Sequence, residues 1–152
     1  MDLFLDAVIL EPTNRCMSAK ITKAHYETLA GFRYSLRKFL RFSEDAAKSV
    51  GLTPQQHQAM LTIKGFPGRE QITIGELAER LQIKHHSAVG LADRLVLEKY
   101  AARVTDKKDQ RQVHLVLTAH GEAVLEKLSA SHRQQLEHFG PEMAGLLKKL
   151  RG

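Results

Sequence analysis

The stretch from Thr73 to Thr118 constrains the fold more than any other part of the chain. The hydroxyl of Thr73 can accept a hydrogen bond from a free amide at the start of a helix, and Glu76 can reach back to the amide of Thr73. This capping box predicts a short helix over residues 73–81. A tight break at Gln82-Ile83-Lys84 follows it.

A second helix is predicted to begin near His85. Its apolar residues recur at the i, i+3, i+4 and i+7 positions that make one face of a helix. They are Ala88, Leu91, Ala92 and Leu95. The opposite face is largely polar. Two short helices joined by a tight turn, the second with a polar outer face, have the layout of a helix-turn-helix.

Two short β-prone runs, Ala101–Thr105 and Gln112–Leu117, come next. The second run is expected to alternate and to place three side chains inward, those of Val113, Leu115 and Leu117. The loop between the runs, Asp106–Arg111, has no glycine, whereas a compact hairpin would favour Asn-Gly or Asp-Gly. We therefore expect a projecting, charged loop, which is a wing.

In this order and spacing, four short motifs resemble those of the MarR family of winged-helix transcriptional regulators. They are GELAERL at residues 75–81, DRL at 93–95, Asp-Gln-Arg at 109–111 and LTAHG at 117–121. The resemblance covers residues 52–121. It differs at Lys84-His85-His86, at Gly90 and at Tyr100, which puts the base preference in doubt but not the fold.

The second helix is the expected recognition helix. Its residues expected at DNA are His85, His86, Ser87, Val89, Gly90, Asp93 and Arg94. Ser87 and Arg94 suit phosphates, the two histidines suit phosphates or base edges, and Gly90 allows close approach of the backbone. A merely solvated helix face is the alternative interpretation.

In the wing, the residues expected to contact DNA are Lys107, Lys108, Gln110 and Arg111. The resemblance and the projecting loop favour insertion of Arg111 into the minor groove, whose negative potential attracts arginine. Asp109 would be repelled by phosphate and is expected to fix Arg111 or to cap the turn. A solvated hairpin is again the alternative.

Long helices are predicted on both sides of this unit, and the whole chain, residues 1–152, is expected to be a single domain. Residues 1–17 would be an arm, residues 18–51 and 119–152 dimerisation helices, and residues 52–118 the winged helix-turn-helix. Gly51 is expected to end the first long helix, and Gly140-Pro141 to break the last one near His138. The fold class is thus mainly α with a small β-wing.

Between these parts, Thr53-Pro54-Gln55-Gln56 forms a second capping box, for a helix that ends at Gly65. Ile72 and Ile74 are expected to pair with the strands of the wing. The long helices present more apolar surface than one small core can cover, so we expect a homodimer. Its association should be sensitive to charges placed at Leu29, Phe32 or Leu128.

The composition narrows the classes of function. The net charge of +6 and the pI of about 9.6 allow a polyanionic partner. No apolar run is long enough for a membrane span, and we expect a cytoplasmic protein. The sequence contains no phosphate-binding glycine loop, no nucleophile–base motif and no zinc spacing, so no enzyme, cofactor or metal site is expected.

Cys16 is the single cysteine, which excludes an internal disulfide and fits a reducing compartment. The resemblance suggests a redox role for an N-terminal cysteine near tyrosines, here Tyr26 and Tyr34. Lowered thiol pKa and exposure would be needed for that chemistry, and we favour a cysteine without a sensing role.

Together these features predict a homodimeric repressor that binds a pseudo-palindromic operator in double-stranded DNA. The resemblance implies relief by a small-molecule or oxidant effector at the junction of the winged helix and the dimer helices. The alternative is a winged-helix domain used for protein–protein contact, against which the basic wing argues.

Overall fold

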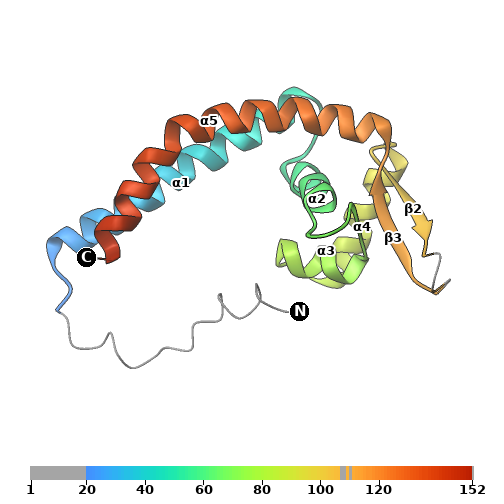
Figure 1. Cartoon of the computed structure of the whole chain (residues 1–152), viewed down its shortest axis with the longest axis horizontal. Helices are drawn as coiled ribbons and strands as arrows, with labels where there is room; N and C mark the ends of the chain where they lie inside the picture. Colours follow the sequence, from blue (N-terminus) through green and yellow to red (C-terminus); the bar gives the residue numbers. More distant parts are fainter. Residues whose placement is uncertain (1–19, 107–108, 110, 152) are drawn as a thin grey trace.

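In the computed structural model, the described residues are 20–106, 109 and 111–151. The element order is α1 (Lys23–Ser49), α2 (Pro54–Lys64), β1 (Gln71–Ile72), α3 (Ile74–Leu81), α4 (His85–Leu97), β2 (Ala101–Thr105), β3 (Val113–Leu117) and α5 (Ala119–Arg151). α1 and α5 lie side by side and form an arch, and the smaller elements hang from one end of it (Figure 1). The predicted fold class, mainly α with a small β-wing and long terminal helices, is confirmed.

Local signals in the sequence explain where most helices begin and end. Thr53 and Thr73 each form the predicted capping box, with Gln56 and Glu76 as the returning side chains. Gly51, just beyond the last turn of α1, has a φ of 82°, which glycine adopts without strain. The first long helix begins later than predicted, at Lys23, because Thr22 and His25 form a third capping box.

The predicted break at Gly140-Pro141 is wrong, because α5 continues through Pro141 to Arg151. A proline inside a helix cannot donate a hydrogen bond to the carbonyl one turn earlier. Contacts with α1 hold the helix beyond that point. The hydroxyl of Ser35 donates to Glu142 Oε1 at 2.6 Å, and Lys38 Nζ lies 3.8 Å from Glu142 Oε2.

The three strands form one antiparallel sheet in the order β1-β3-β2. Ile72 pairs with Leu115 as expected, but Ile74 does not pair, because it is the first residue of α3. The expected inward alternation of β3 is wrong at Val113, which is 45% exposed. Val113 pairs with Thr105 at the outer end of the hairpin, where there is no core to cover it.

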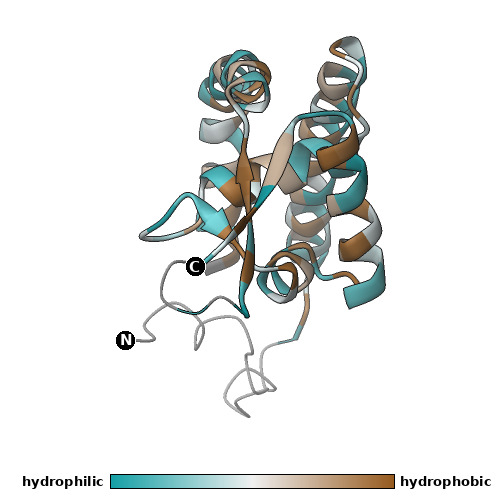
Figure 2. Ribbon diagram, turned by 90° about the vertical axis from the view of Figure 1, so that its right-hand side faces the viewer, coloured by the Kyte–Doolittle hydropathy of each residue, from teal (hydrophilic) through white to brown (hydrophobic). Residues whose placement is uncertain are grey.

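The core lies between the helices of the winged-helix unit, the sheet and the start of α5. Its fully buried members include Met60, Ile63, Leu77, Leu95 and Leu115. Leu128 of α5 also belongs to this core at 3% exposure. Apolar residues colour the strands brown, whereas the helices carry both brown and teal residues (Figure 2).

Candidate nucleic-acid interface

The inner face of α4 fixes which of its side chains can reach a partner. The predicted apolar stripe is confirmed, since Ala88, Leu91, Ala92 and Leu95 are buried. The sequence-predicted contact residues therefore lie on the remaining surface of the helix. His85, His86, Ser87, Asp93 and Arg94 are exposed, and Val89 and Gly90 are half-buried.

The turn before α4 and a hydrogen bond at its far end hold the helix in place. Gln82 takes the left-handed conformation with a φ of 53°, which allows α3 to turn directly into α4. At the other end, the buried Gln56 of α2 donates from Nε2 to Glu98 Oε2 at 2.9 Å. Because Glu98 caps α4, this bond ties the recognition helix to the start of α2.

The helix before α4 is itself anchored by Glu76. Burial raises the pKa of the Glu76 carboxyl, but hydrogen bonds from the amide and hydroxyl of Thr73 and the nearby Arg69 guanidinium outweigh it, and the pKa is lowered. The guanidinium of Arg69 also lies 4.6 Å from the ring centre of Phe66. The capping box of α3 thus joins the α2–β1 loop to the helix-turn-helix.

The two flanks of α4 differ in chemistry. On the flank toward the sheet, Arg103 Nη2 of β2 donates to Asp93 Oδ1 at 2.6 Å. On the other flank, a groove of about 400 Å³ lies between α4 and α2, which we call the α2–α4 groove. Its polar lining is made by Gln55, Gln58, Ser87 and Arg94.

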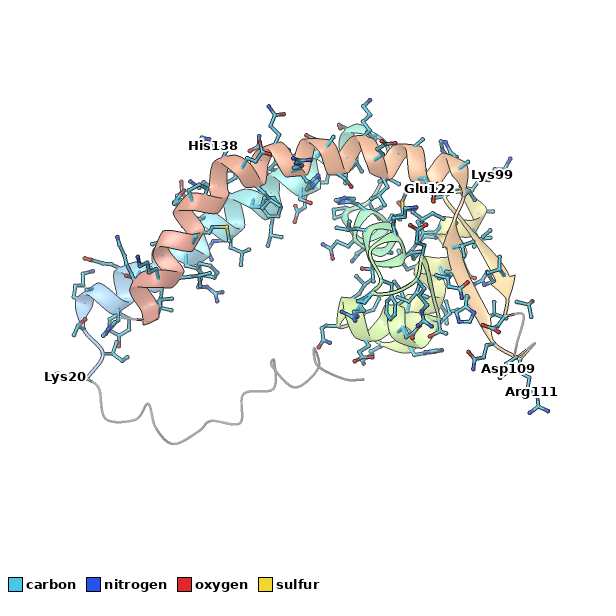
Figure 3. All side chains as sticks on the ribbon, in the orientation of Figure 1. Lys20, Lys99, Asp109, Arg111, Glu122 and His138 are labelled. Carbon is cyan, nitrogen blue, oxygen red and sulfur yellow. The ribbon has the colours of Figure 1, made fainter. Side chains whose placement is uncertain are left out.

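The wing projects beyond the body of the winged-helix unit. The β2–β3 pairing runs from Ala101–Leu117 to Thr105–Val113, and Asp109 and Arg111 lie at its tip (Figure 3). Asp109 Oδ1 accepts a hydrogen bond from the backbone amide of Arg111 at 3.0 Å. Its own amide donates to Asp106 Oδ1 at 3.0 Å, so Asp109 closes the turn, and the side chain of Arg111 is exposed. Lys107, Lys108 and Gln110 lie outside the described residues.

The sequence interpretation missed four residues near this surface. Arg103 gave no motif, and its role depends on the pairing that places β2 beside α4. Gln55 and Gln58 were assigned only to a capping box and a helix. His114 is 2% exposed, with Nδ1 3.8 Å from Asp106 Oδ2, although a histidine in an alternating strand would be expected to face solvent.

A second hollow lies away from α4, where α1, α2 and α5 meet. This junction cavity has a volume of about 540 Å³ and is lined mostly by apolar surface, including Phe39, Leu61 and Leu136. His57 and His132 line it as well, with ring centres 4.7 Å apart. Burial, together with the neighbouring His132, lowers the pKa of His57.

The two histidines of the junction cavity are bonded differently. His132 Nε2 lies 2.8 Å from Ser43 Oγ of α1, and its Nδ1 lies 2.7 Å from the carbonyl oxygen of Leu128. His57 Nδ1 is buried and has no hydrogen-bond partner among the described residues. A buried polar atom without a partner is uncommon in proteins and favours a site that a polar ligand atom or water can complete.

Other kinds of site find little support in the described part of the chain. Residues 20–106, 109 and 111–151 contain no group of three or more histidine, cysteine, aspartate or glutamate residues arranged to hold a metal ion. Within the same ranges, each helix is too short or too polar to cross a membrane. Cys16 lies outside the described residues.

Comparison with known proteins agrees with this architecture. The family model described as MarR family matches residues 50–112, from the end of α1 to the wing. A crystal structure of a MarR family protein from Bacillus stearothermophilus superposes with a TM-score of 0.71 at 20% identity, covering 88% of this chain and 94% of that one. The chain is a MarR-family winged-helix protein.

Two further MarR-family comparisons extend this result. The HTH-type transcriptional repressor MdtR of Bacillus subtilis is 28% identical over 95 residues, and the matched segment is 62% of this chain and 59% of MdtR. The structure of the AbsC regulator of Streptomyces coelicolor has a TM-score of 0.67 at 16% identity, covering 83% of this chain and 84% of that one. The structural likeness includes both long helices, which the family-model match does not reach.

Proposed function

We propose that the protein is a sequence-specific DNA-binding transcriptional regulator, and specifically a repressor. One observation carries the proposal: α4 presents exposed polar residues while its apolar side is buried, and a wing projects beside it. A helix about 10–12 Å wide fits the B-DNA major groove, which is about 12 Å wide. Arg111 at the tip would then reach the adjacent minor groove.

The Asp93–Arg103 ion pair supports this arrangement. A carboxylate that faces DNA would repel phosphates, but a guanidinium 2.6 Å away offsets its charge. The MdtR relative is a repressor by name, and the related MepR of S. aureus was crystallised with an oligodeoxyribonucleotide. Both facts describe those proteins and support the same activity here.

We further propose that two copies form the active unit. Leu29, Leu40, Leu136 and Leu147 on the long helices are 43–46% exposed in one chain. A C₂ dimer would present two recognition helices to half-sites about 10–10.5 bp apart, in the cytoplasm where chromosomal DNA lies. Of the three sites chosen for testing association, Leu128 is unsuitable, because it lies in the core of the single chain.

For the effector we propose a small molecule in the junction cavity, and not oxidation of Cys16. The cavity touches α2 of the winged helix and both long helices, so a ligand there could change their relative position. Its apolar lining and the unpartnered His57 Nδ1 suit a mostly apolar molecule with one hydrogen-bonding group. Relief of repression requires that the ligand bind the two positions with different affinity.

A gel shift with total genomic fragments at increasing salt tests the DNA-binding proposal. A regulator should retain a few fragments at salt concentrations that release the rest, because base contacts persist when counterion release weakens phosphate contacts. A winged helix used for protein–protein contact would retain no fragment selectively. Thermal shifts in the presence of aromatic and aliphatic compounds, compared with a Leu61→Trp variant that fills the cavity, test the effector site.

A further inference from the structure

The α2–α4 groove contains four polar side chains that are free to bind a partner. Gln55 and Gln58 come from α2, and Ser87 and Arg94 from α4. All four are exposed, and none forms a side-chain hydrogen bond or ion pair with another described residue. The lining contains no aspartate or glutamate, so Arg94 is its single charge.

The groove is open in front of α4 because residue 90 is glycine. A Cβ atom built on Gly90 would meet no other atom within 4 Å. The floor is apolar, with Leu81 and Ile83 of the helix-turn-helix joint beside it. A polar rim of donors over an apolar floor matches a sugar–phosphate backbone, which carries anionic oxygens and apolar sugar carbons.

The position of the groove indicates which nucleic-acid element would fill it. A helix in the major groove nearly spans its width, so a phosphate backbone passes along each side of the helix. On the sheet side of α4 lie Asp93 and Arg103. The α2–α4 groove lies on the other side, toward Ser87 and Arg94.

We infer that this groove holds the sugar–phosphate backbone of one DNA strand, and that α2 is a third DNA-binding element beside α4 and the wing. Gln55 and Gln58 donate amide hydrogen bonds to phosphate oxygens, and Arg94 adds a charged contact. These contacts fix the position of α4 without reading sequence. The inference rests on the proposed DNA-binding function.

The combined Gln55→Ala and Gln58→Ala variant tests the inference. Its affinity should fall on the order of ten-fold, as expected for two lost neutral hydrogen bonds. The loss should be similar for a duplex selected from a random pool and for the unselected pool. The slope of log affinity against log salt should not change, because neutral amides displace no counterions.

Two comparison variants sharpen the test. Arg94→Gln should lower the salt slope by about one contact. Gly90→Leu should fold, because its side chain enters open space, but it should exclude the backbone and weaken binding more than Gly90→Ala does. Gln134→Ala, on the exposed surface of α5, is the matched control and should bind as the wild type does.

Unchanged affinity of the double glutamine variant would overturn the inference. If Arg111→Ala still weakened binding in the same assay, the proposed DNA-binding function would stand without the α2 contact. If the folded wild-type protein bound neither duplex, both the inference and the proposed function would be wrong.

Discussion

Arg103 donates to Asp93 across the joint between the wing and the recognition helix, with 2.6 Å between Nη2 and Oδ1. Both side chains are partly exposed, at 38% and 57%, so the pair should contribute less than about 1 kcal/mol to stability. Its larger effect should be electrostatic, because it sets the charge that this flank of α4 presents to DNA.

Asp93→Asn should therefore strengthen DNA binding. The change removes a negative charge and frees the guanidinium of Arg103 for phosphate. Affinity for selected and unselected duplexes should rise together, and the salt slope should become steeper by about one contact. Fluorescence anisotropy at several salt concentrations measures both quantities. Weaker binding, with the fold intact, would show that Asp93 contacts a base directly.

Gly121, near the start of α5, should be intolerant of any side chain. A Cβ atom there would overlap the carbonyl oxygen and carbon of Tyr100, which are backbone atoms and cannot rotate away. Gly121→Ala should destabilise the protein by about 1–3 kcal/mol, as overpacking does. The matched control is Gly75→Ala in α3, whose Cβ would meet only Thr73 Oγ1 at 3.9 Å. Urea denaturation should show a loss for the first variant and none for the second.

The sequence predicted those parts of the fold that depend on neighbouring residues. Capping threonines, Gly51 and the spacing of the buried α4 residues are local signals, and each was confirmed. Features that depend on distant contacts were not predicted. α5 continues through Pro141 because Ser35 and Lys38, far away in the chain, contact Glu142.

The same distinction applies to the candidate site. Periodicity predicted which side of α4 is buried, and therefore which side is exposed. It gave no indication of Arg103 or of the two glutamines in the α2–α4 groove, because these meet α4 only after the chain has folded. His114 was missed because its burial depends on the pairing of β3 with both neighbouring strands.

Protonation of His57 should destabilise the folded protein. Its pKa is lowered in the fold, by burial and by His132, so the unfolded chain binds the proton more readily. The free energy of unfolding should stay level above the ordinary histidine pKa of about 6.5 and fall below it, by at most about 1.4 kcal/mol per pH unit. In the non-titrating variant His57→Leu, urea midpoints between pH 8 and pH 5 should change less. An equal change in both proteins would contradict this assignment.

Charges on the exposed apolar residues of the long helices should separate the proposed dimer. Leu29→Glu and Leu147→Glu place a carboxylate where one chain leaves 44% and 46% of a leucine exposed. Sedimentation equilibrium should give folded monomers or a much weaker dimer. Leu128→Glu should instead unfold the chain, because Leu128 is buried in its own core. A wild-type protein that stays monomeric at micromolar concentration would contradict the proposal.

Arg111 offers the sharpest test of the wing. Its side chain is exposed at the tip, where the carboxylate of Asp109 holds the backbone of the turn. Arg111→Ala should weaken operator binding by about 1–3 kcal/mol and reduce any preference for A·T-rich flanks. Circular dichroism should show an unchanged fold, because the side chain makes no core contact. An unchanged affinity would leave the wing as a solvated hairpin.

The central claim is that α4 and the wing read a DNA sequence. Selection of bound duplexes from a random pool, followed by sequencing, tests it most directly. The account predicts one enriched motif with two-fold symmetry and half-sites about 10–10.5 bp apart, lost when Arg94 and Arg111 are both replaced by alanine. A pool that stays random after repeated selection with folded wild-type protein would contradict the claim.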